Sequence, residues 1–297
     1  MASGNDRVAS MAGVFWNDGV WTTEEQKLTG PMDHAFWLGS VVFDGGRAIR
    51  GTVPDLDLHC ARVVRSAEAM LMKPTLAAPE IEALCREGVR RMGPEAVLYI
   101  RPMFFARGGM PPLRPDPATT VFTLAIYDSP LPGAAGFSAT LAPFRRPAPD
   151  QAPTDAKASC LYPNSARATV WAFERGFDNA VVCDADGRIA EFASANLMAV
   201  KDGVVFTPAH NGSFLNGITR QRVIALLRGA GVEVREVAMD SVDLDSADEI
   251  FSTGNYGKVQ PCTRYGTRNL NAGPVAAEAR RLYMEFCETA RMLPRVD

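Results

Sequence analysis

Apolar residues recur along the chain with two different spacings, one typical of helices and one typical of strands. Helical spacing, with apolar side chains three and four residues apart, marks the longer segments. In the first of them Leu56, Val63 and Ala67 fall on one stripe, and Lys73-Pro74 ends the pattern. The segments predicted to be helical are 55–72, 78–92, 163–176, 218–231 and 274–292.

Shorter apolar runs predict strands. They occupy residues 96–105, 121–127, 137–144, 233–239 and 248–255. Three longer segments, 14–22, 179–191 and 196–208, each contain two apolar runs around an Asp-Gly pair. Asp-Gly supplies the positive φ of a tight turn, so these segments predict hairpins. Residues 33–50 predict a short helix and then a strand with a glycine-rich turn, and 240–247 a short helix or turn.

Helices and hairpins therefore alternate in a pattern that predicts a mixed α/β (α+β) fold. The length of 297 residues is sufficient for two domains. The stretch DSPLPGAAG at 128–136 has the composition of a linker, and ARGGMPPLRPDPATT at 106–120 that of an irregular loop. We therefore place a first domain at 1–128, an interdomain loop at 129–136 and a second domain at 137–297.

Composition narrows the class of protein. The net charge of −3 and the pI near 5.7 argue against a nucleic-acid partner. No stretch approaches the ~18 apolar residues of a membrane span, and the N-terminus lacks the apolar core of a signal peptide. The six cysteines are dispersed and contain no CxxC pair, which favours buried free thiols in a reducing cytoplasm. The three histidines lack metal-ligand spacing, so we expect no metal site.

The segment 155–196 carries the candidate chemistry. It contains Lys157, Tyr162 and Glu191 among small residues. This set suits a carbonyl cofactor, because a lysine forms a Schiff base, a carboxylate faces a ring nitrogen and a phenol faces a ring oxygen. The alternative for each is ordinary: a surface lysine, a packed tyrosine and an exposed strand carboxylate.

A candidate anion site lies where the helix of 218–231 begins. Gly217, Ile218 and Thr219 would direct backbone N–H groups and the positive end of the helix dipole at one point. The Thr219 hydroxyl adds a donor. Asn216 could instead serve as a helix cap, and the two functions are compatible.

Six stretches resemble the class IV aminotransferases, which are pyridoxal phosphate enzymes of fold type IV, and among them the branched-chain aminotransferases. They are HCARVVRSA (59–67), YIRPMFF (99–105), DAKASCLY (155–162), IAEFASANLMAVKDG (189–203), LNGITR (215–220) and ADEIFSTGN (247–255). Their order and spacing are similar to those of the family over nearly the whole chain. The resemblance implies ping-pong amino transfer between an amino donor and a 2-oxo acid, in a homodimer whose subunits complete each other's sites.

The resemblance also implies a role for each matching residue. Lys157 would be the catalytic Schiff-base lysine, Glu191 the partner of the ring nitrogen and Tyr162 the partner of the ring oxygen. Leu215 would lie against the ring face, with Gly217, Ile218 and Thr219 around the phosphate. Arg62 matches the phosphate-binding arginine, for which Arg65 is the competing candidate. Asn255 stands where branched-chain enzymes usually have a phosphate-binding threonine, and its amide could still donate.

A second group concerns the substrate. Tyr99 and Arg101 match the YxR strand of branched-chain enzymes, and Phe43 lies in VFDGGR, which resembles VFEGxR. Tyr256 and Gly257 follow Asn255 in a turn that helps to hold the substrate carboxylate in the family. These matches favour a branched-chain L-amino acid as the donor.

Three departures keep other substrates open. Leu38 replaces a family tyrosine, the loop at 107–115 is rewritten, and 128–136 lacks the tyrosine that a partner subunit usually lends. An (R)-selective amine or D-amino-acid transaminase is therefore the alternative reading. Arg107 and Arg114 could clamp a carboxylate or be solvated loop charges. A pyridoxal phosphate lyase and a non-catalytic binding protein are the remaining hypotheses.

Overall fold

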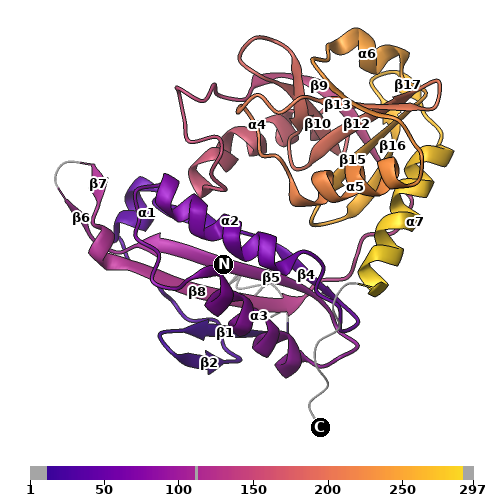
Figure 1. Ribbon diagram of the computed structural model, residues 1–297. Helices are drawn as coiled ribbons and strands as arrows, with labels where there is room; N and C mark the ends of the chain where they lie inside the picture. Colours follow the sequence, from indigo (N-terminus) through magenta and orange to yellow (C-terminus); the bar gives the residue numbers. More distant parts are fainter. Residues whose placement is uncertain (1–11, 111–112, 290–297) are drawn as a thin grey trace, which may run out of the picture.

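The computed structural model describes residues 12–110 and 113–289. Figure 1 shows two lobes: the first is drawn in indigo to magenta, and the second runs from magenta and rose through orange to yellow. Each lobe is built around its own β-sheet. The strands of the first sheet come from residues 13–128 and those of the second from residues 137–269. The domain bounds at 128 and 137 remain a prediction.

The first sheet has the strand order β2-β1-β8-β5-β3, with β4 also pairing with β5. Its strands are β1 (Gly13–Asn17), β2 (Val20–Thr22), β3 (Val41–Phe43), β4 (Gly46–Ile49), β5 (Val97–Ala106) and β8 (Thr120–Asp128). Helices α2 (Leu56–Ala69) and α3 (Ala78–Met92) pack on one face, where Leu98, Ile100 and Phe104 are buried. Because side chains alternate along β5, Tyr99 and Arg101 lie on the opposite face.

Shorter elements complete the first lobe. They are α1 (His34–Leu38), β6 (Gly109–Met110), β7 (Arg114–Pro115) and the 3-10 turn η1 (Pro117–Thr119). The segment predicted as an irregular loop therefore contains a small ladder, since β6 pairs with β7.

The second sheet has the order β11-β10-β9-β16-β15-β12-β13-β14, and β17 pairs with β16. Its strands are β9 (Phe137–Arg145), β10 (Asn179–Cys183), β11 (Ile189–Phe192), β12 (Asn196–Lys201), β13 (Val204–Pro208), β14 (Val234–Val237), β15 (Glu249–Gly254), β16 (Lys258–Tyr265) and β17 (Arg268–Asn269). The helices are η2 (Ser159–Leu161), α4 (Tyr162–Phe173), α5 (Ile218–Gly229), α6 (Ser241–Ser246) and α7 (Pro274–Thr289). Apolar side chains of α5 and α7 share a core with β12, β15 and β16.

The mixed α/β class and the three predicted hairpins are confirmed. At the first hairpin Asp18 and Gly19 have φ values of 47° and 85°, as an Asp-Gly turn requires. The sequence reasoning missed β16, which lies between β15 and β9 in the sheet. Pro261 explains the omission, because proline within a run argues against an interior strand. For the helix predicted at 274–292, residues 290–292 lie outside the described residues.

The structure bears on two predictions, one about membrane-spanning segments and one about the cysteines. Among residues 12–110 and 113–289, no helix combines the length and the apolar character needed to cross a membrane. All six cysteines are free thiols. Four of them are buried as predicted, but Cys160 is exposed and Cys183 is only partly buried.

The segment that carries Lys157 belongs to the second half of the chain but packs on the first lobe. Ala158 forms a β-bridge with Val42, and the Lys157 carbonyl accepts from the Phe43 amide at 3.1 Å. The Lys157 amide donates to the Ser66 hydroxyl at 3.0 Å. Ala156 and Ala158 are buried in the core of the first lobe. Lys157 is therefore fixed at the junction of the lobes.

An ion pair also joins the lobes. Arg222 of α5 donates from Nε to both carboxylate oxygens of Asp55, at 3.2 and 3.3 Å, and from Nη2 to one of them. Asp55 is buried and precedes α2 with φ 54°. A buried carboxylate that accepts from two N–H groups of one guanidinium stabilises the contact between α2 and α5.

Asp55→Asn tests this junction, because asparagine tolerates the same left-handed φ and removes only the charge. We expect the free energy of unfolding to fall by about 1–3 kcal/mol, measured by urea denaturation. The control is Glu278→Gln, which breaks an exposed ion pair with Arg281 on α7 and should leave the free energy nearly unchanged. Equal midpoints for Asp55→Asn and the unaltered protein would contradict the assignment.

Candidate active site

A cavity between the lobes collects most of the predicted site residues. Its lining includes Phe43, Arg62, Tyr99, Lys157, Tyr162, Glu191, Leu215, Gly217, Ile218, Thr219, Asn255 and Tyr256. Residues from β3, β5 and α2 of the first lobe face residues from β11, β15 and the start of α5. Arg101, Gly257 and Arg65 are not part of the lining.

Lys157 has the geometry of a reactive amine. Its Nζ donates to the Tyr162 hydroxyl at 2.6 Å and lies 4.8 Å from the centroid of the Phe43 ring. The Tyr162 and Phe43 rings are in turn 5.1 Å apart. The two rings limit where the amine can go, and the phenol oxygen fixes its direction into the cavity.

Glu191 is largely shielded from solvent, with 12% of its side chain exposed, and both of its oxygens have partners. Arg146 Nε lies 3.3 Å from Oε1, and Asn196 Nδ2 donates to Oε2 at 3.4 Å. Burial raises the pKa of Glu191 to about 7, against the opposing effect of the charges on Arg146 and Lys157. Burial prevails because both contacts are long and Arg146 Nε also donates to the Ser213 carbonyl at 3.1 Å. The carboxylate is thus prepared to receive a cationic or proton-bearing partner.

The start of α5, where the anion site is predicted, lines the cavity with Gly217, Ile218 and Thr219. A Cβ placed on Gly217 would lie 2.1 Å from Asn196 Oδ1, so only glycine fits there. Thr219 is buried and lines the cavity. The helix cap is Gly217, with no side-chain capping bond, so the capping reading of Asn216 is wrong. Its Oδ1 accepts instead from Arg220 Nη1 at 2.9 Å.

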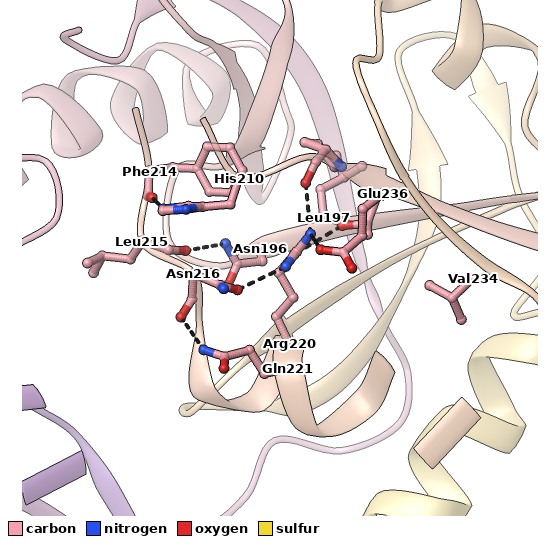
Figure 2. A network of polar contacts seen from close by, with 12 residues as sticks. Asn196, Leu197, His210, Phe214, Leu215, Asn216, Arg220, Gln221, Val234 and Glu236 are labelled. Carbon is pink, nitrogen blue, oxygen red and sulfur yellow. Dashed lines mark hydrogen bonds and ion pairs between the residues drawn. The ribbon is translucent and has the colours of Figure 1, made fainter. Parts of the chain in front are cut away.

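Figure 2 shows the polar contacts that hold the loop before α5 in place. Arg220 is fully buried and donates to the Pro208 carbonyl at 2.8 Å and to Glu236 Oε2 at 3.0 Å, in addition to Asn216. Asn196 Nδ2 donates to the Leu215 carbonyl at 2.9 Å. The loop before α5 is therefore tied to β12, β13 and β14, which fixes the direction of its backbone N–H groups.

Arg62 supplies a positive charge on the opposite wall. The Asp44 carboxylate accepts two hydrogen bonds from Arg62, from Nε at 2.7 Å and from Nη2 at 2.9 Å. It also accepts from His59 Nδ1 at 2.7 Å. Although burial opposes ionisation, Arg62 and His59 hold the pKa of Asp44 well below its usual range. Of the two candidate arginines, Arg62 lines the cavity and Arg65 is exposed outside it.

Sequence reasoning missed Thr253, whose hydroxyl is buried at the cavity without a hydrogen-bond partner among the described residues. A buried hydroxyl of this kind costs free energy unless a ligand satisfies it. Arg146, Asn196 and Asp44 were also missed. The signal for Thr253 was its place at the end of a strand, beside Asn255. Asp44 gave a weaker signal, as the acidic residue next to a glycine-rich turn.

The two predicted substrate residues outside the lining have clear reasons for their positions. Arg101 donates from Nη2 to the Tyr127 hydroxyl and lies 5.4 Å from the Tyr99 ring centroid, farther along the sheet. A Cβ on Gly257 would meet Gln260 and Pro132, at 2.7 and 3.2 Å, so this glycine faces the linker. Tyr256 does line the cavity and is 64% exposed at its mouth.

These features together fit an aldehyde cofactor with a ring nitrogen and a phosphate. The amine, the phenol and the carboxylate lie in one cavity. Arg62, the unsatisfied Thr253 hydroxyl and the start of α5 provide the donors that a phosphate requires.

The family of the chain follows from comparison with known proteins. A profile of the family "Amino-transferase class IV" matches residues 41–265, and the chain belongs to this family of aminotransferases. The branched-chain-amino-acid aminotransferase of Salmonella typhimurium is 31% identical over 287 residues, which cover 93% of this chain and 92% of that protein.

Solved structures agree with this assignment. A Brucella abortus aminotransferase bound to the cofactor PLP is similar, with 46% identity and a TM-score of 0.92, over 93% of this chain and 99% of that one. The branched-chain amino acid aminotransferase of Escherichia coli has 27% identity and a TM-score of 0.86, over 96% and 100%.

Glu191→Gln should stabilise the protein when no ligand is bound. As pH rises from 4.5 to about 7, the unfolded chain releases this proton before the folded protein does, so stability falls with rising pH. At pH 8 the cost is on the order of 3 kcal/mol. Glutamine removes it, and urea denaturation of the cofactor-free proteins at pH 5 and pH 8 should show a much larger difference at pH 8 than at pH 5. A less stable variant at pH 8 would contradict the buried-carboxylate assignment.

Proposed function

We propose that this aminotransferase uses pyridoxal phosphate to move an amino group between a branched-chain L-amino acid and a 2-oxo acid. The observation that carries the proposal is the 2.6 Å contact between Lys157 Nζ and the Tyr162 hydroxyl, in the same cavity as Glu191. The named relatives, which include branched-chain aminotransferases at 31% and 27% identity, support the choice of substrate.

Each side chain has a distinct task in this proposal. When bound, pyridoxal phosphate supplies the aldehyde carbon that takes up the amino group and a ring that delocalises electrons released at Cα. Lys157 Nζ removes the proton from Cα and returns it to the cofactor side. The Tyr162 hydroxyl orients that amine, and Glu191 holds a proton on the ring nitrogen. Leu215, which lines the cavity, would lie against the ring face.

The phosphate would be held by Arg62 and by the backbone N–H groups of Ile218 and Thr219, with the Thr219 hydroxyl. The Thr253 hydroxyl is a further donor, since it has no other partner among the described residues. Phe43, Tyr99 and Tyr256 line the part of the cavity left for the substrate. Asn255 also lines the cavity, and we propose that its side-chain amide donates to a bound anion. Arg101 and Gly257 would reach the substrate only if their neighbours moved.

The comparisons do not favour the alternative of an (R)-selective amine or D-amino-acid transaminase, since the relatives named from Salmonella typhimurium and Escherichia coli are branched-chain enzymes. Membership of an aminotransferase family argues equally against a lyase and against a non-catalytic binding protein. Arg107 does not line the cavity and lies instead over the Phe105 ring.

We also infer a homodimer in the cytoplasm. Large apolar side chains are exposed on and beside α1, where Phe36 is 65% and Trp37 is 59% exposed, and Met32 and Leu113 are exposed nearby. A second subunit would cover such a surface. The free state of all six cysteines is consistent with a reducing compartment.

Lys157→Ala should abolish transamination, because no other described lysine lines the cavity. Borohydride reduction of the purified protein, followed by peptide mass mapping, should place the covalently trapped cofactor on residue 157 and nowhere else. Lys201→Ala, at an exposed lysine paired with Asp248, serves as the control and should keep full activity. Substantial turnover by Lys157→Ala would overturn the mechanism.

The substrate is tested by single-turnover spectra. L-leucine, (R)-1-phenylethylamine and D-alanine are mixed separately with the yellow holoenzyme, and the visible absorbance of the bound cofactor is followed. We expect L-leucine to bleach this absorbance at least about tenfold faster than the other two, a preference of about 1.4 kcal/mol in the barrier. Faster bleaching by the amine or by D-alanine would move the enzyme to the alternative class.

A further inference from the structure

Lys258 is a buried lysine next to the cavity, outside the set of residues assigned to the cofactor or the substrate. Its side chain is 2% exposed, and no carboxylate of the described residues is within ion-pair distance of its ammonium group. It opens β16 after a three-residue turn and has φ 60°, a conformation that hairpins of this kind normally give to glycine. A lysine at a position that suits glycine, with its charge buried, suggests a function that outweighs the strain.

The ammonium group of Lys258 fixes the orientation of the Asn255 amide. Lys258 Nζ donates at 2.7 Å to one end of this amide and, having no acceptor, must face its oxygen. The other end, Nδ2, lies 3.2 Å from the Gly46 carbonyl, which can only accept. Both contacts require the same orientation, and Arg47 Nε holds the Asn255 backbone carbonyl at 3.3 Å. The amide therefore cannot turn.

One N–H of this amide is left for the cavity. Nδ2 carries two hydrogens, and Gly46 takes one. Asn255 Nδ2 and the Tyr99 hydroxyl both lie against Gly45, at 3.2 and 2.1 Å from the position that a Cβ there would take, so the absence of a side chain at Gly45 lets the two groups come close together. Gly45, Tyr99 and Asn255 all line the cavity. Two neighbouring donors on one wall of the cavity suit a carboxylate.

We propose that Lys258 is a positioning residue that locks the Asn255 amide, so that its free N–H donates to the carboxylate of the amino-acid substrate beside the Tyr99 hydroxyl. The proposal rests on the aminotransferase function above and assigns the Asn255 amide to the substrate carboxylate and not to the phosphate. Burial lowers the pKa of Lys258 to about 8, which still leaves it mostly protonated at neutral pH. The charge on Lys258 polarises the amide and strengthens its N–H as a donor.

The test compares Lys258→Met, which keeps the length but removes the donor, with Lys258→Gln, whose amide can still donate to Asn255. Holoenzymes are assayed with L-leucine, and the dissociation constant of 4-methylpentanoate, a carboxylate without the amino group, is measured by titration. We expect Lys258→Met to raise KM and this dissociation constant about tenfold with a smaller change in kcat. Lys258→Gln should recover most of the loss, and Lys201→Met should match the unaltered enzyme.

Retention of pyridoxal phosphate separates the carboxylate from the phosphate as the anion. Equilibrium dialysis should give the same cofactor affinity for Lys258→Met and the unaltered protein. A weakened cofactor affinity would overturn the proposal in favour of the phosphate, and unchanged KM and 4-methylpentanoate affinity would overturn it outright. Failure of the branched-chain assignment is distinct, because it would appear in the unaltered enzyme as absence of L-leucine turnover.

Discussion

The docking of the lysine segment onto the first lobe is the contact on which the active site depends. Ala158 pairs with Val42, and the Lys157 backbone is held on both sides, by Phe43 and by Ser66. Small residues make this possible, because Ala156 and Ala158 are buried where larger side chains would not fit. The amine therefore belongs to one half of the chain and is positioned by the other. A change in the first lobe that moved β3 or α2 would therefore move Lys157 Nζ.

Charge is distributed unevenly around the cavity. Arg62 lines the cavity, and the buried Arg47 and Lys258 both contact Asn255 of the same lining, whereas the carboxylate of Glu191 lies beside Arg146. Arg62 is balanced by Asp44, whose carboxylate is saturated by its partners and does not reach further. Such a field orients a molecule that carries a phosphate, a carboxylate and a basic ring nitrogen before any close contact forms. It also limits the number of ways in which the molecule can bind.

The sequence predicted the elements that depend on residues close together in the chain. Asp18-Gly19 predicts its turn, and the apolar stripe with Leu56 and Val63 predicts its helix. Residues whose role depends on distant partners were harder to find. Arg146 contacts Glu191 although the two residues are 45 positions apart in the sequence. Pro261 argues against a strand in the sequence, but β16 forms because strands pair with it on both sides. Arg101 was expected in the cavity beside Tyr99, but two residues along a strand span ~6.6 Å, and its guanidinium meets Tyr127 instead. The family resemblance supplied much of the site, because it carries information from three-dimensional neighbours that periodicity lacks.

The same residues that weaken the fold are those that would bind. The Thr253 hydroxyl is buried without a partner, the Glu191 carboxylate is buried against its preference, and Lys258 combines a buried charge with a strained backbone. Each would lower the stability of the protein without ligand, and each would be relieved or used when an anion or a protonated ring is bound. Pairing these groups within the protein would remove the cost, but it would also remove the donors and the charge that hold the ligand. Binding of a ligand to these groups would therefore recover the free energy that they cost the folded protein. Cofactor binding and the stability of the junction between the lobes are coupled for this reason.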